Sequence, residues 1–167
     1  MTASAAGIAA PEHAAKREEL LALLTKAYWM EIETVMSYIA NSVNLDGVHA
    51  QEIRESLETD VAEELGHARQ FAARIHELYG TVPGSLDFQA EQAFLQPPAE
   101  PTDVLHVIKG VIEAENGAVA HYNRIIEAAD GVDWVTQDLA IEVLRDEEGH
   151  RRLFEGFLRE HERAGTA

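Results

Sequence analysis

Two short stretches of the chain, EELGHARQF at 63–71 and DEEGHRRLF at 146–154, each place a glutamate three residues before a histidine. In an α-helix this spacing puts Glu64 and His67, and likewise Glu147 and His150, on one face. One such pair is usually a solvated surface pair. Two pairs in near-identical surroundings, 83 residues apart, instead predict a metal site built from two halves, because carboxylates and imidazoles bind divalent metal ions.

The same repeat selects two more glutamates from the segments that precede these stretches. Glu31 and Glu33 lie before the first stretch, and Glu113 and Glu115 lie before the second. A shift of 84 residues carries Glu31 onto Glu115, whereas Glu33 and Glu113 correspond to residues that cannot ligate a metal. We therefore expect Glu31 and Glu115 to complete the site.

The predicted constellation contains four carboxylates and two imidazoles, from Glu31, Glu64, His67, Glu115, Glu147 and His150. This set of oxygen and nitrogen donors suits two iron or manganese ions better than a closed structural zinc site. The four carboxylates, if ionised, carry a charge that two divalent cations balance. The alternative, four solvated surface glutamates, leaves their shared register beside apolar residues unexplained.

Tyr38 and Tyr122 follow Glu31 and Glu115 by seven residues, which is two helical turns and places each tyrosine on the same face as its glutamate. We expect their hydroxyls to orient ligating carboxylates from across the bundle. The alternative is a pair of core tyrosines whose hydroxyls bond to the backbone.

Two matched glycines, Gly66 and Gly149, precede the histidines of the two stretches. Glycine costs about 1 kcal/mol in a helix interior relative to alanine. The matched positions therefore suggest a close approach between helices beside the site.

Four segments with helical spacing of apolar residues must position these groups: about 12–44, 48–80, 102–129 and 132–162, with Thr102 as the cap of the third. The first and last connections are short, so each pair of helices forms an antiparallel hairpin. Residues 81–101 hold four of the five prolines and form one long connection. Extended, these residues span up to about 70 Å, more than the roughly 45 Å of a 30-residue helix. We expect one bundle over 16–163, preceded by a tail at 1–15.

Composition narrows the classes of function. The chain has 167 residues, no cysteine and a formal net charge of −17, so nucleic-acid binding and thiolate metal sites are not expected. No apolar run is long enough for a membrane span, and no signal segment is evident, so we expect a cytoplasmic protein without membrane contact. The six other histidines, His121 among them, are expected on the surface.

The sequence resembles the bacterioferritin-like and Dps-like members of the ferritin-like superfamily. The resemblance rests on EIETVMSY, EELGH, AENGAVAHY and IEVLRDEEGH, and it covers about residues 16–163. It implies an all-α, ferritin-like four-helix bundle of two antiparallel helical hairpins joined by a long crossover. It also implies a di-iron ferroxidase centre in which Glu64 and Glu147 bridge two iron ions. Glu31 with His67, and Glu115 with His150, would each ligate one ion.

Two departures from the bacterioferritin pattern shape the remaining expectations. The haem-ligating methionine of that family is replaced here by Leu65, so no haem is expected. Only 17 residues follow His150, which leaves hardly any room for the fifth helix of 24-subunit cages. We therefore expect a homo-oligomer, with a twelve-subunit shell favoured over 24 subunits.

The resemblance implies binding of Fe(II) and its oxidation by dioxygen or hydrogen peroxide, for iron storage or detoxification. Manganese is also compatible with the donor set. Two other functions stay open: a di-iron or di-manganese oxidase or peroxidase that acts on peroxide or a small molecule without storing mineral, and a non-catalytic binding or cargo bundle.

Overall fold

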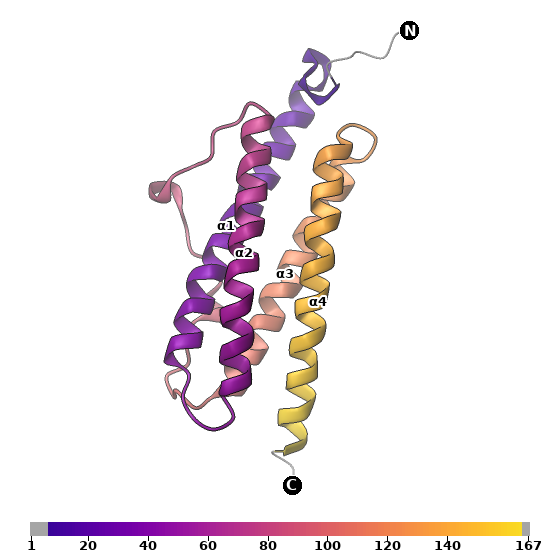
Figure 1. Cartoon of the computed structure of the whole chain (residues 1–167). Coiled ribbons are helices and arrows are strands. Elements are labelled where there is room, and N and C mark those ends of the chain that lie inside the picture. The colour runs from indigo at the N-terminus through magenta and orange to yellow at the C-terminus, as the bar shows by residue number, and fades with distance from the viewer. Residues whose placement is uncertain (1–6, 165–167) are drawn as a thin grey trace.

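A computed structural model describes residues 7–164 and shows four long helices (Figure 1). The helices are α1 (Ala14–Asn44), α2 (Gln51–Glu77), α3 (Val104–Ala129) and α4 (Trp134–Ala164). Two short 3-10 turns, η1 (Gly7–Ala9) and η2 (Pro11–His13), precede α1. No strand occurs between residues 7 and 164, so the prediction of an all-α fold is confirmed. Residues 1–6 of the expected tail lie outside the described residues, and the proposed boundary at residue 16 stays a prediction.

The start of α3 differs from the prediction. Thr102 is not the cap; Asp103 is, because its carboxylate accepts a hydrogen bond of 3.0 Å from the backbone N–H of His106. A carboxylate satisfies a free N–H group of the first turn and also interacts favourably with the helix dipole. The hydroxyl of Thr102 instead donates to Glu100 at 3.1 Å.

The helices pack as two hairpins, α1 with α2 and α3 with α4, as the short connections predicted. Between the hairpins, α1 lies against α3, and α2 faces α4 at a wider separation. The long connection contains the 3-10 turns η3 (Ser85–Asp87) and η4 (Ala93–Leu95), and it travels from the end of α2 to the opposite end of the bundle (Figure 1). This crossover is confirmed. No helix in residues 7–164 combines the length and apolar character that crossing a membrane requires.

Polar anchors fasten the crossover onto the bundle. The buried carboxylate of Glu33 accepts backbone N–H groups of Glu91 and Gln92, at 2.9 and 2.7 Å. Near the far end, η4 lies so close to α3 that a Cβ on Gly110 would be 2.6 Å from the carbonyl oxygen of Phe94. Glu33, which the repeat excluded as a metal ligand, thus holds the crossover in place.

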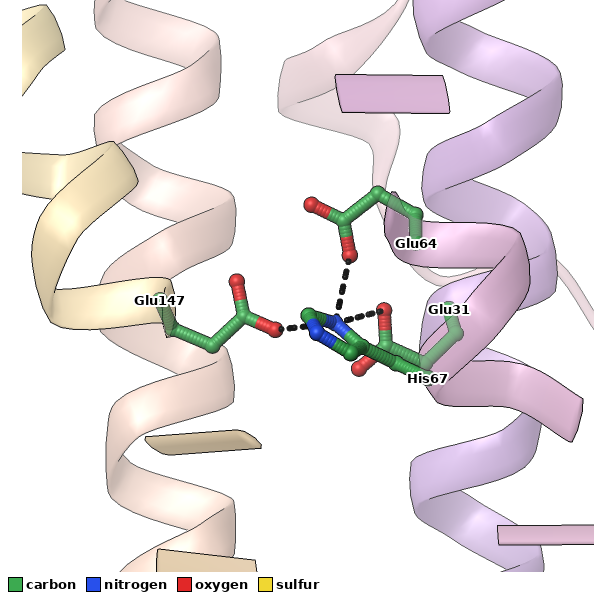
Figure 2. A group of neighbouring side chains, drawn as sticks. All are labelled: Glu31, Glu64, His67 and Glu147. Atoms are coloured by element: carbon green, nitrogen blue, oxygen red, sulfur yellow. Dashed lines mark ion pairs between the residues drawn. The ribbon is translucent and has the colours of Figure 1, made fainter. Parts of the chain in front are cut away.

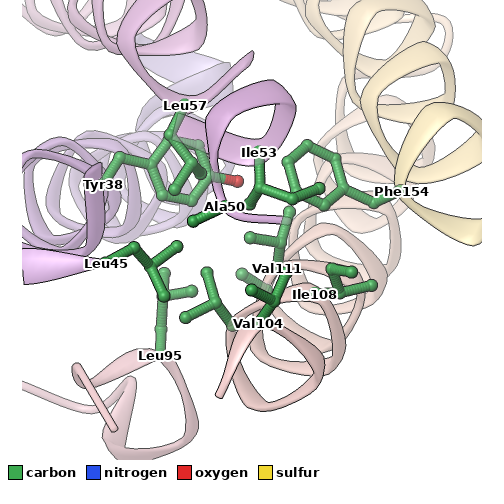
Figure 3. Packing of buried hydrophobic residues seen from close by; sticks show 12 residues of the cluster. Tyr38, Leu45, Ala50, Ile53, Leu57, Leu95, Val104, Ile108, Val111 and Phe154 are labelled. Carbon is green, nitrogen blue, oxygen red and sulfur yellow. The ribbon is translucent and has the colours of Figure 1, made fainter. Parts of the chain in front are cut away.

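Two apolar clusters fill the bundle, one toward each end. One contains Tyr38, Leu45, Ala50, Ile53, Leu57, Leu95, Val104, Val107, Ile108, Val111, Ala114 and Phe154 (Figure 3). The other includes Leu20, Leu24, Phe71, Ile75, Tyr122, Ile125, Ala129 and Val143. The phenylalanines of the two repeated stretches, Phe71 and Phe154, lie in different clusters. The repeat therefore packs both ends of the bundle, and the glutamates and histidines lie between the two clusters.

Candidate metal centre

All six predicted site residues converge in the middle of the bundle. Each is at most 8% exposed. They form two overlapping groups whose possible ligand atoms lie within 4.8 Å of one another: Glu31, Glu64, His67 and Glu147 (Figure 2), and Glu64, Glu115, Glu147 and His150. Glu64 and Glu147 belong to both groups. The arrangement is consistent with a dinuclear metal site.

The two histidines turn the same ring atom, Nδ1, toward the centre. His67 Nδ1 lies 3.0 Å from Glu147 Oε1 and 3.5 Å from Glu64 Oε2. His150 Nδ1 lies 3.3 Å from Glu64 Oε1 and 3.4 Å from Glu147 Oε2. Each imidazole therefore faces both of the shared carboxylates, one from its own helix and one from the other hairpin.

Four buried polar atoms at this point have no hydrogen-bond partner: Glu64 Oε1, His67 Nδ1, Glu147 Oε1 and His150 Nδ1. These four atoms lie near one another, but their distances and angles do not form hydrogen bonds. Buried polar atoms without partners cost about 1–3 kcal/mol each. Metal ions would satisfy all four atoms, and the charge and chemistry of these donors fit two divalent cations.

Each tyrosine donates its hydroxyl across the bundle to a glutamate of the other hairpin. Tyr38 on α1 donates to Glu115 Oε1 on α3 at 2.6 Å, and Tyr122 on α3 donates to Glu31 on α1. Both tyrosines are fully buried. One oxygen of each glutamate is thus held by a tyrosine, which leaves the other oxygen to face the centre.

The outer ring nitrogens of the histidines contact two acidic residues that the sequence analysis missed. His67 Nε2 lies 3.2 Å from Asp146 Oδ2, and His150 Nε2 lies 2.7 Å from Glu63 Oε2. Each acid therefore comes from the hairpin opposite its histidine. A signal was present, because Glu63 and Asp146 directly precede the glutamates of the two repeated stretches and align with each other. Their side chains are 54% and 50% exposed, so they reach solvent between α2 and α4.

A third acid, Asp60, lies beside one histidine and has no counterpart at the other. Its side chain is buried, its Oδ1 is 3.9 Å from His150 Nε2, and its Oδ2 has no hydrogen-bond partner. Burial raises the pKa of Asp60 to about 6, although His150 partly offsets this effect. The 83-residue shift places Val143 at the equivalent position. Asp60 therefore has no acidic counterpart in the second half of the chain, and the repeat gives no signal for it.

Burial and crowding change the protonation of the centre in the absence of metal. Burial, together with the charges of Glu64 and Glu147, raises the pKa of Glu31 well above its usual value, and the pKa of Glu115 is raised in the same way. Burial alone would lower the pKa of both histidines. The neighbouring carboxylates of Glu147 and Glu64 outweigh it and raise the pKa to about 10 for His67 and about 12 for His150. Protons therefore occupy the cluster when metal is absent, and metal binding must displace them.

Two expectations about neighbouring residues are wrong. His121 is buried rather than exposed, and its Nε2 lies 2.8 Å from the carbonyl oxygen of Leu23. A Cβ added to Gly66 or Gly149 would meet no atom within 4 Å, so these glycines do not mark a close approach between helices. We find no packing reason for either glycine.

Comparison with known proteins places this chain in a family. The family model described as a ferritin-like domain matches residues 21–164. The chain belongs to the ferritin-like family. A DNA protection during starvation protein of Pyrococcus furiosus is 33% identical over 144 residues, 84% of this chain and 77% of that protein. The bacterioferritin of Desulfovibrio desulfuricans is 23% identical over 84% of this chain and 74% of its own length.

Solved structures agree on the fold of this ferritin-like chain. The dodecameric thioferritin of Bacteroides fragilis, a bacterioferritin-related protein, superposes with a TM-score of 0.78 at 23% identity, over 90% of both chains. The bacterioferritin structure of Desulfovibrio desulfuricans, which contains a diiron site, gives the same TM-score at 20% identity over 90% of this chain and 84% of that one. The predicted ferritin-like fold is confirmed.

Proposed function

We propose that this ferritin-like protein is a ferroxidase, which binds two Fe(II) ions per chain and oxidises them with dioxygen or hydrogen peroxide. The observation that carries the proposal is the pair of overlapping buried clusters that share Glu64 and Glu147 and contain four polar atoms without partners. In the proposed assignment, both ions would share these two glutamates. Glu31 with His67 would hold one ion, and Glu115 with His150 would hold the other. No part of the proposal requires haem.

The surrounding residues have supporting roles in this proposal. Tyr38 and Tyr122 fix one oxygen of Glu115 and Glu31, so that the other oxygen stays available for metal. Glu63 and Asp146 hold the outer nitrogens of the histidines, which orients both rings with Nδ1 inward. These two acids are half-exposed, and with the net charge of −17 they favour the approach of cations between α2 and α4.

The oxidised iron would be stored or detoxified in a shell of identical chains. Two observations support assembly: the relative from Bacteroides fragilis is dodecameric, and α1 exposes an apolar stripe of Met36, Ile39 and Val43. We propose twelve subunits for this chain also. The acidic composition argues against a role for DNA in this function, despite the name of the Pyrococcus relative.

A second candidate is a di-iron or di-manganese peroxidase that does not store mineral, because the same donors bind manganese. The cavity beside the four glutamates has a volume of only about 10 Å³, which favours a very small oxidant such as peroxide over an organic substrate. Storage of iron beyond two ions per chain distinguishes the two functions.

Aerobic Fe(II) titration of protein purified without metal, followed by ferric absorbance and light scattering, tests the proposal. We expect fast oxidation of two Fe(II) per chain, continued loading and a large particle. Glu64→Ala and His150→Ala should abolish the fast phase while circular dichroism shows that the helices remain. Unchanged oxidation kinetics in both variants would refute the site assignment. A small oligomer that stops at two metals would favour the peroxidase.

A further inference from the structure

A second opening approaches the metal centre from the seam between α1 and α3, away from the acids of α2 and α4. An open pocket of about 310 Å³ lies on this side, partly under the crossover. The cavity of about 10 Å³ beside the glutamates shares Met30, Gln92 and Ala114 with that pocket. These three residues therefore form the partition between the outer pocket and the centre.

Gln92 is the part of this partition that comes from the crossover. It is 6% exposed, and its side-chain amide donates to the hydroxyl of Thr34 at 2.9 Å and to the carbonyl of Met30 at 3.3 Å. Its backbone N–H donates to Glu33 at 2.7 Å. The other residues that line the inner cavity belong to the four helices. Gln92 is thus fixed against α1 by three hydrogen bonds, as the one residue of the partition that comes from the crossover.

The charge at this opening differs from that between α2 and α4. Lys26 and Arg124 line the outer pocket together with His121, and after burial both contribute to the lowered pKa of this histidine. The two acids of the pocket are engaged: Glu33 accepts backbone N–H groups, and Glu91 pairs with Lys26. A divalent cation gains little here, whereas a small neutral molecule meets no electrostatic barrier.

We infer that the opening between α1 and α3 admits the oxidant, and that Gln92 is a specificity-determining residue that limits it to molecules the size of dioxygen or hydrogen peroxide. This inference rests on the proposed ferroxidase function. With hydrogen peroxide, each of two Fe(II) ions gives one electron, the O–O bond breaks, and two protons are taken up to form two waters. The inner cavity of about 10 Å³ has room for about one water-sized molecule, so the partition favours a small oxidant over a branched organic peroxide.

A comparison of oxidant sizes tests the inference. Protein loaded anaerobically with two Fe(II) per chain is mixed rapidly with hydrogen peroxide or tert-butyl hydroperoxide, and the ferric absorbance gives a rate for each. Gln92→Ala should raise the rate with tert-butyl hydroperoxide, relative to hydrogen peroxide, by about tenfold or more, because it widens the partition. Gln92→Phe should lower the rate with hydrogen peroxide by about tenfold. Gln89→Ala and Gln89→Phe, at an exposed position of the same crossover, should change neither rate.

Anaerobic Co(II) titration separates the possible failures. If the Gln92 variants bind two Co(II) per chain but keep the wild-type ratio of rates, the inference is overturned. If wild-type protein binds two Co(II) but oxidises Fe(II) with neither oxidant, the proposed function fails, and the inference fails with it. If a Gln92 variant loses Co(II) binding, Ala114→Val narrows the same partition from α3 without altering the crossover. An unchanged hydrogen peroxide rate in that variant, with two Co(II) bound, would also overturn the inference.

Discussion

The half of the centre around His67 and the half around His150 are near copies in sequence but have different surroundings. Toward the centre both imidazoles face the same two carboxylates, at 3.0–3.5 Å. On the outer side, His67 contacts only Asp146 among the acids described, whereas His150 has Glu63 at 2.7 Å and the buried Asp60 at 3.9 Å. A repeated helix pattern thus produces equivalent inner geometry but leaves the two halves of the candidate centre chemically unequal.

The first prediction concerns Glu64, a group that both halves of the centre share. Glu64→Ala should lower the affinity for both metals by more than about 100-fold, the upper range for removing an outer partner. Glu115→Ala should abolish only the position beside His150 and leave one metal per chain. Anaerobic Co(II) titration counts the bound ions. Loss of one metal in both variants would show that Glu64 is not shared.

The second prediction concerns the protons that both halves hold without metal. The folded-state pKa values of about 10 and 12 exceed the ordinary histidine value of 6.5, so these groups stabilise the fold fully below pH 6.5. That contribution falls as pH rises above 6.5 and is lost once pH exceeds the folded-state pKa values of the two histidines. The raised pKa of Glu31 and of Glu115 acts in the same direction above pH 4.5. Each histidine that keeps its proton only in the folded state contributes about 1.4 kcal/mol per pH unit, so the free energy of unfolding without metal should fall by on the order of 5 kcal/mol between pH 7 and 9.

Bound metal should reverse this pH dependence, because metal requires the histidines and glutamates without their protons. Urea denaturation at pH 7, 8 and 9, with a chelator and separately with Mn(II), measures both slopes. A metal-free protein whose stability rises with pH in this window would contradict the protonation of the cluster.

The third prediction concerns the acids beside the outer nitrogens of the two histidines, which differ between the half around His67 and the half around His150. Asp146→Asn should lower the affinity of the position beside His67 by about tenfold, within the range for outer partners of ligating histidines. Glu63→Gln should have a smaller effect, because Asp60 remains beside His150. The double variant Asp60→Asn with Glu63→Gln should lower the metal affinity of the position beside His150 by about tenfold. The exposed Glu58→Gln on α2 serves as a matched control, and stepwise Co(II) titration resolves the two positions. Equal losses in the two single variants would mean that Asp60 does not compensate.

The fourth prediction is that loss of either tyrosine hydroxyl lowers metal affinity slightly and by the same amount. Tyr38→Phe and Tyr122→Phe each remove one buried hydrogen bond to a glutamate, at a cost of about 1 kcal/mol or a several-fold loss of metal affinity. Because the two bonds are equivalent across the bundle, the losses should match within twofold, a difference of about 0.4 kcal/mol. Affinity measured by competition with a chromophoric chelator gives both values. Clearly unequal losses of metal affinity in the two variants would show that the two tyrosines also differ in their contribution.

The fold and most of the candidate centre could be predicted because they follow from periodic patterns. Helical spacing located α1 to α4, and the 83- and 84-residue shifts selected the six residues that the structure brings together. Glu63 and Asp146 obey the same repeat, so the 83-residue shift also relates these two acids to each other. Asp60 and Gln92 obey no repeat, so no pattern within the chain identified them.

Helical periodicity and repeat spacing are local properties of the chain, so they alone predict the two hairpins, the long crossover and the matched pairs of glutamate and histidine. Which side chains meet across the two hairpins depends instead on how the hairpins pack against each other. Glu33 became an anchor because the crossover happens to pass over it, and His121 became buried because α3 lies against α1. Contacts of this kind depend on how surfaces far apart in sequence fit together, and neither spacing nor composition encodes that fit.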